Sequence, residues 1–271
     1  MIAFSLWQIH VYRYGIFYLI TAIIGYWFLR WVGKQGWFKK SPGIQHLLTN
    51  GIDDLILFTI CGILIGGRLG HVFLYDRPYY STHLKEIFAI RHGGMSFVWG
   101  IIGVVFAIFL VEKKFNLSKK EFFIIFDLLL LIVPIGIVLW RIGNFLNQEL
   151  YGIVVPETLR RLGSSILTHV YPSVDHNLRI NTNFIAAFFE WLCIWIILVI
   201  QLFKQLAHKR KPWMISVTFI MLYSCIRFFL EFLRQDSQAE HIWPLTTTQR
   251  AMVIFLGFGF AIWFMYDTKD K

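Results

Sequence analysis

A run of polar residues, "RIGNFLNQELYG" (141–152), directly follows the long apolar stretch "FIIFDLLLLIVPIGIVLW" (123–140). It contains Arg141, Asn144, Asn147 and Glu149. At the edge of an apolar segment such groups cost free energy unless a partner or a ligand binds them. The planar guanidinium of arginine suits phosphate, which it can bind through two hydrogen bonds. The run is therefore predicted to hold an anionic group.

Other ionisable residues lie inside apolar stretches: Arg68, Asp127, Glu190, Arg227 and Glu231. An ionisable residue within a membrane span suggests function, and the alternatives are structural pairing between helices or snorkelling near helix ends. Arg227, Glu231 and Arg234 are spaced i, i+4 and i+7, on one helical face. We therefore expect Glu231 to hold one arginine in position while another meets the substrate.

The remaining motifs limit the chemistry. Glycines in "GGRLG" (66–70) and "HGGMSFVWGIIG" (92–103) indicate close helix packing or turns. The sequence has no CxxC, HExxH or P-loop motif, so we expect neither a metal ion nor another cofactor. Cys61, Cys193 and Cys225 all lie in apolar runs, which favours small buried side chains over disulfides.

The composition indicates the elements that must position these residues. The chain has 271 residues, of which 57% are hydrophobic and only 15% charged, whereas soluble domains have about 25% charged residues. Its net charge of +10 comes from basic clusters between apolar runs, which favours a membrane protein over a nucleic-acid binder. The N-terminal "MIAFSLWQIHVYRYG" lacks the pattern of a removable signal peptide, so we expect none.

The apolar runs predict an all-α, polytopic membrane protein with seven transmembrane helices. Each run approaches the roughly 17–25 residues that a membrane helix needs, and none has the alternation of barrel strands. We expect a single domain, 1–271, with an outer segment at about 142–183. The predicted spans lie near 15–33, 54–75, 96–111, 121–140, 184–203, 213–233 and 250–266.

Every second link between spans is basic, which places those links and the C-terminus in the cytoplasm and the N-terminus outside. At about 1.5 Å per residue, Arg68 and Arg227 lie roughly 20 Å, and Arg141 about 30 Å, from the inner edge. Asp127 lies nearer the cytoplasmic end. Three guanidiniums in the outer half of the bilayer predict a site for a phospholipid phosphate. The basic residues are Arg30, Lys34, Lys39 and Lys40, then Lys113, Lys114, Lys119 and Lys120, then Lys204, Lys209, Arg210 and Lys211.

Together these stretches resemble the bacterial prolipoprotein diacylglyceryl transferase family. "RIGNFLNQELYG" matches the family run Arg-x-Gly-Asn-Phe-x-Asn-x-Glu-x-x-Gly at every fixed position. "IGGRLG", "GGMSF", Tyr14–Gly15, Asp127 and "IRFFLEFLRQ" (226–235) match in order and spacing. The resemblance covers roughly residues 12 to 250, with a variable segment at 153–183.

The resemblance implies an enzyme of the bacterial inner membrane. It would transfer a diacylglyceryl group from phosphatidylglycerol to the lipobox cysteine of prolipoprotein signal peptides and release glycerol phosphate. We expect it to act as a monomer and to bind no nucleic acid. The implied catalytic residues are Arg141, Arg227, Glu149, Asn144, Tyr14 and His92, and the implied substrate-binding residues are Arg141, Asn144, Asn147, Gly152, Glu231, Arg234 and Arg68.

Two departures from the family pattern leave alternatives open. Val98-Trp99-Gly100 stands where the family has His-Gly-Gly, whose histidine is a natural base for the thiol. "INTNFIA" (180–186) replaces the family's His-Pro-x-Gln-Leu-Tyr-Glu. His92 could be the base, or be a loop histidine while the thiol ionises unaided. The alternatives to an active transferase are a divergent or inactive phospholipid-binding paralogue, or a transporter, whose expected inverted repeats are not evident.

Overall fold

The computed structural model describes residues 2–6, 9–75, 77–89, 94–163, 165–207, 211–235, 241–242 and 245–267. By its internal contacts the chain divides into two compact units. One comprises Gly25–Ile125, and the other combines Met1–Ile24 with Phe126–Lys271.

Six helical segments of the described residues are long and apolar enough to cross a membrane, as expected of a multipass membrane protein. They coincide with six of the predicted spans, with ends that differ by a few residues. The predicted span at 96–111 corresponds to α5 (Phe97–Phe115), whose last turns carry Glu112, Lys113 and Lys114 and which is not among the six. The six are Gly15–Gln35, Ile52–Leu74, Lys119–Leu146, Thr182–Leu206, Met214–Leu233 and Thr247–Met265.

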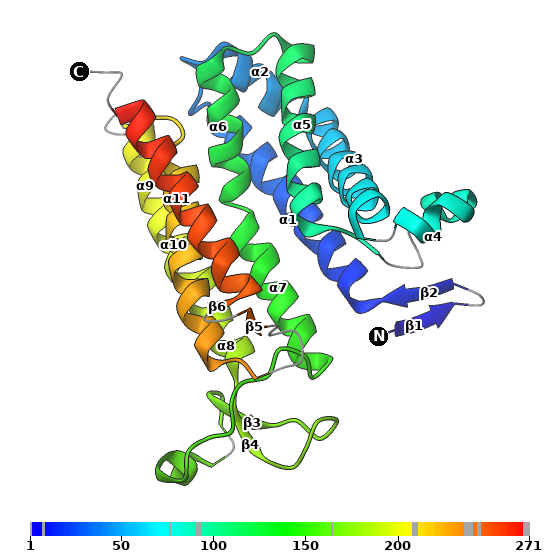
Figure 1. Ribbon diagram of the computed structural model, residues 1–271. Coiled ribbons are helices and arrows are strands. Elements are labelled where there is room, and N and C mark those ends of the chain that lie inside the picture. The colour runs from blue at the N-terminus through cyan, green and yellow to red at the C-terminus, as the bar shows by residue number, and fades with distance from the viewer. Residues whose placement is uncertain are drawn as a thin grey trace. The chain divides into compact units, whose positions relative to one another are not determined.

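In the Gly25–Ile125 unit, α3 (Ile52–Gly70) and α5 pack against each other (Figure 1). Glycines allow this close approach, because a Cβ added at Gly66 would lie 2.9 Å from Gly103 Cα. The prediction of close helix packing at these glycines is confirmed. The other elements are the C-terminal part of α1 (Arg13–Gln35), α2 (Pro42–Asn50), η1 (His71–Tyr75), α4 (Arg77–Thr82), η2 (Leu84–Phe88) and the start of α6 (Lys119–Leu130).

In the other unit, α7 (Val133–Leu146) follows α6 after a short break and runs beyond the predicted end at residue 140. Arg141 and Asn144 therefore belong to a helix and not to a loop. Both are buried, with 6% and 1% of their surfaces exposed. The helix continues past the first polar residue because these side chains face protein, so their polarity does not mark the end of the span.

The remaining helices of this unit are α8 (Thr182–Ala186), the π-helix η5 (Ala187–Cys193), α9 (Ile194–Leu206), α10 (Met214–Leu230), the 3-10 turn η6 (Glu231–Leu233) and α11 (Thr247–Asp267). Buried Asp127 accepts hydrogen bonds from Trp213 N (2.8 Å), Ser216 N (2.9 Å) and Ser216 Oγ (2.6 Å). These bonds satisfy backbone donors at the start of α10. Asp127 therefore has a structural role.

Within the described residues, three pairs of short antiparallel strands accompany the helices, and the prediction of an all-α chain missed them. They are β1 (Ile2–Leu6) with β2 (Ile9–Tyr12), β3 (Thr168–Val170) with β4 (Leu178–Ile180), and β5 (His241–Ile242) with β6 (Leu245–Thr246). The β3–β4 hairpin pairs Thr168 with Ile180 and lies beyond the ends of α7 and α8 (Figure 1). The 3-10 helix η4 (Glu157–Leu162) precedes it.

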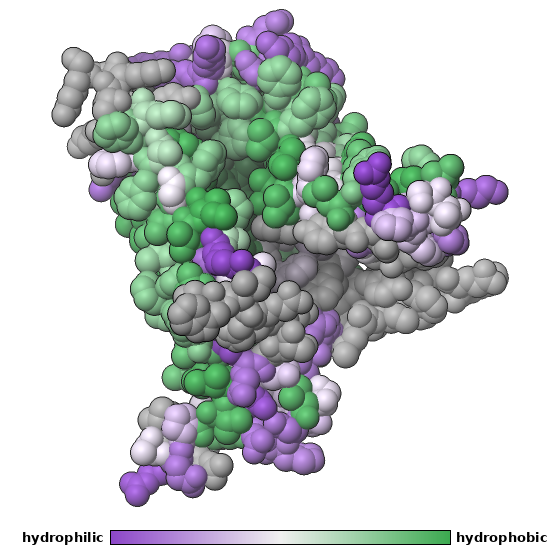
Figure 2. Space-filling view, in the orientation of Figure 1, coloured by the Kyte–Doolittle hydropathy of each residue, from purple (hydrophilic) through white to green (hydrophobic). Residues whose placement is uncertain are grey.

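The visible surface of this unit separates apolar helices from a polar end. Hydrophobic side chains cover the helices, whereas hydrophilic ones gather over the β3–β4 region (Figure 2). Large apolar residues of α11, such as Ile254 and Phe264, are 71% and 66% exposed. Such exposure is typical of lipid-facing helices, since hydrocarbon is the natural contact of these side chains.

Candidate active site

The polar motif 141–152 forms the end of α7 and the turn that follows it. The backbone N–H of Asn147 donates to Gly143 O (2.9 Å), and that of Glu149 donates to Asn144 O (2.8 Å). Gln148 and Leu150 then adopt left-handed φ angles of 56° and 54°. These two uncommon conformations reverse the chain tightly, so the turn needs support from elsewhere.

Arg179 and two residues of the 180–186 segment, which departs from the family pattern, give that support. Asn183 Nδ2 donates to Glu149 O (2.8 Å), and Thr182 Oγ1 donates to Leu150 O. Arg179 Nη1 donates to Gly152 O (3.1 Å). Asn183, Thr182 and Arg179 are all buried. The polar residues at 179–183 therefore stabilise the motif turn by donating hydrogen bonds to its backbone carbonyls.

Gly152 lies where three stretches of backbone meet. Its N–H donates to Ile180 O (3.1 Å), and it forms an isolated bridge with Arg234. A Cβ at this position would lie 2.5 Å from Ile180 O and 2.9 Å from Leu233 O. The close approach that glycine permits is thus between protein segments, and contact of Gly152 with substrate stays a prediction.

Five ionic side chains form a buried row of alternating charge. Arg141 donates to Glu190 from Nε (3.0 Å to Oε2) and from Nη2 (2.9 Å to Oε1 and 2.7 Å to Oε2). Arg227 Nη1 lies 4.0 Å from Glu190 Oε1, and its Nη2 lies 3.1 Å from Glu231 Oε2. Glu231 also accepts from Arg234 Nη1 (2.8 and 3.1 Å). Three guanidiniums against two carboxylates give these five groups a formal charge of +1.

The row brings together Arg141, Arg227, Glu231 and Arg234, as the sequence predicted. Its fifth member, Glu190, was noted as an ionisable residue within a span but was not assigned to the site. It comes from η5, 49 residues after Arg141, and none of its surface is exposed. The expectation that Glu231 holds an arginine agrees with its contacts to both Arg227 and Arg234.

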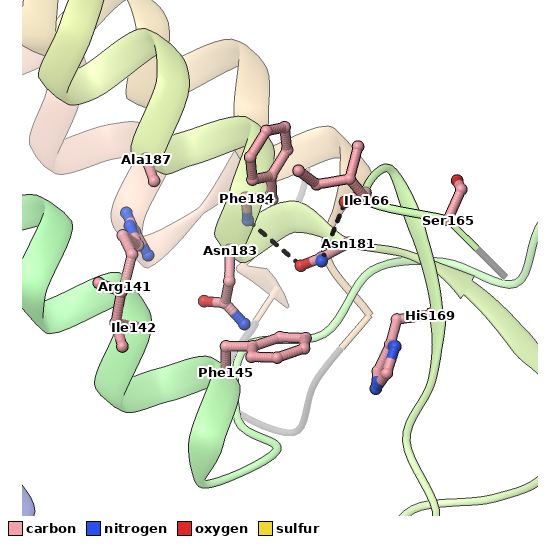
Figure 3. Close-up of a pocket in the computed structure, with 10 residues that line it drawn as sticks. All are labelled: Arg141, Ile142, Phe145, Ser165, Ile166, His169, Asn181, Asn183, Phe184 and Ala187. Carbon is pink, nitrogen blue, oxygen red and sulfur yellow. Dashed lines mark hydrogen bonds between the residues drawn. The ribbon is translucent and has the colours of Figure 1, made fainter.

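A cavity of about 260 Å³ lies beside Arg141 (Figure 3). Glu190 occupies Nε and Nη2 of Arg141, while Nη1 makes no hydrogen bond to the described part of the chain. The wall is mostly apolar, with a few polar groups that could orient a ligand. The lining residues are Arg141, Ile142, Phe145, Ser165, Ile166, His169, Asn181, Asn183, Phe184 and Ala187.

The β3–β4 hairpin brings His169 and Tyr171 to this region, and sequence reasoning identified neither. The His169 ring lies 4.9 Å from that of Phe145, centroid to centroid. Burial raises the pKa of Tyr171 to about 12, so its hydroxyl stays protonated and donates to Asn181 Oδ1 (3.3 Å). Asn181 Oδ1 also accepts from Phe184 N at the start of α8 (3.2 Å). No motif marked these residues, because only the fold brings the hairpin to α7.

The other predicted site residues are placed as follows. Arg68 belongs to the Gly25–Ile125 unit, where it donates to Ile87 O (2.8 Å) and Gly94 O (3.1 Å). It thus holds loop carbonyls, and its contact with phosphate stays a prediction. Tyr14 lies in the first turn of α1. His92 lies outside the described residues, so its role as a base also stays a prediction.

These features define a multipass helical membrane protein with a buried arginine–carboxylate row beside a cavity. The prolipoprotein diacylglyceryl transferase family matches residues 1–265, and the chain belongs to this family. It is 34% identical over 280 residues to the phosphatidylglycerol–prolipoprotein diacylglyceryl transferase of Wolbachia pipientis, covering 99% of this chain and 97% of the relative. Relatives of the same name from Rickettsia bellii (32%; 91% and 87% covered) and Nitratidesulfovibrio vulgaris (30%; 99% and 93%) are also similar.

Proposed function

We propose that this protein transfers the diacylglyceryl group of phosphatidylglycerol to the lipobox cysteine of prolipoproteins. The observation that carries the proposal is the positively charged row from Arg141 to Arg234, which begins in the family motif at Arg141, beside a cavity. A phosphate monoester bears more negative charge when it leaves than the diester from which it forms. Fixed guanidiniums therefore stabilise the transition state more than the substrate.

The reaction breaks one carbon–oxygen bond and forms one carbon–sulfur bond. The acceptor thiol loses its proton, and the thiolate attacks the glyceryl carbon that bears the phosphate. The electron pair of the broken bond goes to the phosphate oxygen, and glycerol phosphate departs. Arg141 and Arg227 would stabilise that oxygen, Arg68, Arg234, Glu231 and Asn147 would bind the headgroup, and Asn144, Glu149 and Tyr14 would orient it.

The acceptor thiol must lose its proton before it attacks. A thiol has a reference pKa of about 8.5, so a few per cent is thiolate near neutral pH. Nearby guanidiniums favour the thiolate further. If no dedicated base exists, His92→Ala leaves the rate within about threefold, a barrier change under 1.36 kcal/mol. If His92 is the base, the same substitution abolishes transfer at pH 7 and leaves partial activity at pH 9.

The proposal includes a topology. The basic links support seven crossings, with α5 as the seventh, the N-terminus outside and the C-terminus in the cytoplasm. The helix α5 has 19 residues, enough to cross the hydrocarbon, and its charged last turns would lie among the headgroups. We propose a single domain that functions as a monomer in the bacterial inner membrane.

The test uses the purified chain in detergent micelles with phosphatidylglycerol and a lipobox peptide. We expect the peptide to gain the mass of one diacylglyceryl group as a thioether. A peptide with serine in place of the lipobox cysteine is the control, because a hydroxyl is far less ionised than a thiol. Absence of the thioether at both pH 7 and pH 9 would refute the proposal.

A second candidate is a divergent paralogue that binds the same lipid and acts on another acceptor. Val98, which is 50% exposed where the family has a histidine, favours it. This candidate predicts saturable binding of phosphatidylglycerol without thioether formation, so the same experiment with a lipid-binding measurement separates the two.

A further inference from the structure

Glu190 is a fully buried carboxylate that bridges the two arginines proposed to act on phosphate. It accepts three hydrogen bonds from Arg141, at 2.7–3.0 Å, and lies 4.0 Å from Arg227 Nη1. None of its surface is exposed. Glu190 lies outside both the motif 141–152 and the 226–235 segment. It is therefore an additional member of the site, and it links the two segments that carry Arg141 and Arg227.

Glu190 lies in a helical segment that is wider than an α-helix. Where the resembled family segment ends in glutamate, this chain has Ala186, and the carboxylate follows four residues later. Residues four apart lie on about the same helical face, one turn along. Glu190 sits within the π-helix η5, directly after α8. Such wide turns shift the helical face locally and occur frequently at functional sites.

A purely stabilising role explains these contacts poorly. Removing two charges from water costs more than a surface pair gains, and buried ion pairs are often no more stabilising than apolar residues of the same size. The pair does achieve a fixed orientation. Glu190 holds the Nε–Nη2 edge of Arg141, so the third nitrogen, Nη1, keeps its donors for another acceptor, and Arg141 lines the cavity. It also offsets repulsion between Arg141 and Arg227.

We propose that Glu190 is a positioning residue, which orients Arg141 and Arg227 toward the leaving phosphate. This inference rests on the proposed function and adds a residue to it. A carboxylate that grips one edge of Arg141 leaves that guanidinium a single defined direction in which to meet phosphate. Loss of the carboxylate frees the side chain to rotate, so the transition state loses stabilisation more than the bound substrate does.

The experiment measures kcat and KM for phosphatidylglycerol with the lipobox peptide. We expect Glu190→Gln to lower kcat at least tenfold while KM changes less than threefold. Glu190→Asp keeps the charge but shortens the side chain, and it serves if the glutamine variant does not fold. Glu157→Gln, at an exposed glutamate of η4, is the control and leaves both constants unchanged.

A double-mutant cycle tests whether Glu190 acts through Arg141. In that case Arg141→Lys with Glu190→Gln is no more than threefold slower than Arg141→Lys alone. Multiplication of the two single effects, both in this cycle and in the matching cycle with Arg227→Lys, overturns the proposal, as does wild-type kcat in Glu190→Gln. Moving the carboxylate back one turn, as Ala186→Glu with Glu190→Ala, is expected to recover at least tenfold over Glu190→Ala.

A readout independent of transfer separates this inference from the proposed function. In protein labelled with ¹⁵N-arginine, the Nε–H resonance of Arg141, assigned by its loss in Arg141→Lys, is expected to exchange slowly with water. Glu190→Gln is expected to speed that exchange. Slow exchange with no transfer by the unmutated protein refutes the function alone, whereas unchanged exchange in Glu190→Gln refutes the positioning.

Discussion

Substitution of Arg141 by lysine keeps the positive charge but removes the planar fork. In the structure Nε and Nη2 hold Glu190, Nη1 makes no hydrogen bond to the described part of the chain, and Arg141 lines the cavity. An ammonium group is one compact nitrogen, so it cannot hold the carboxylate along an edge and present a coplanar donor to phosphate. We therefore expect Arg141→Lys to lose transition-state stabilisation although the net charge is unchanged.

The expected size follows from the loss of one fixed donor to a developing oxyanion. Such a loss raises the barrier by about 2–4 kcal/mol, which is roughly a 30- to 1000-fold decrease in kcat at 1.36 kcal/mol per tenfold. Arg227→Lys should act in the same direction, since its two nitrogens face Glu190 and Glu231.

Initial rates of thioether formation, at saturating phosphatidylglycerol and with matched amounts of folded protein, measure this effect. Arg250→Lys is the matched control, because Arg250 donates to Thr247 within α11 and belongs to no part of the charged row. If Arg141→Lys and Arg227→Lys both keep kcat within threefold of the unmutated protein, phosphate stabilisation by these guanidiniums is refuted.

Three further predictions concern the scaffold. Gly152→Ala should destabilise the protein by about 1–3 kcal/mol, measured by thermal unfolding in detergent, because the added Cβ meets two backbone carbonyls; an unchanged transition would contradict the packing. In a cysteine-free background, cysteines placed at Lys40 and Lys119 should resist a membrane-impermeant thiol reagent in intact cells, and labelling of either would refute the proposed orientation. Hydrogen bonds from Arg179 lower the pKa of Asp175 in the folded protein. The stability that this pair gives the fold is therefore fully present above the pKa of about 3.9 that Asp175 has in the unfolded chain, and it is lost as the pH falls through the lower pKa of the folded state. As the pH falls through this range, hydrogen exchange in the β3–β4 hairpin should therefore accelerate beyond its intrinsic pH dependence. Asp175→Asn lacks the titrating carboxylate and should remove this additional acceleration.

The sequence alone determined the helices and the character of the site. Apolar runs near the length of the hydrocarbon core predict membrane helices without any tertiary information, because the bilayer requires each span to satisfy its own backbone. The spacing of Arg227, Glu231 and Arg234 predicted one helical face, and this was wrong for Arg234, because α10 ends at Leu230 and Arg234 is extended after the 3-10 turn η6. The ion pairs of Glu231 with Arg227 and Arg234 form all the same. The glycines of α3 and α5 were expected to permit close packing for an equally local reason, the absence of a Cβ.

The tertiary structure decided which distant groups meet. Glu190 follows Arg141 by 49 residues, and no periodicity links them; their contact depends on how η5 packs against α7. The same holds for Asn183 and Thr182, whose bonds to the motif turn became visible only when the chain's path placed α8 beside it. The end of α7 at Leu146 was also decided by packing. Polarity in a sequence shows that a group needs a partner, but only the folded chain shows whether that partner is water, lipid or another side chain.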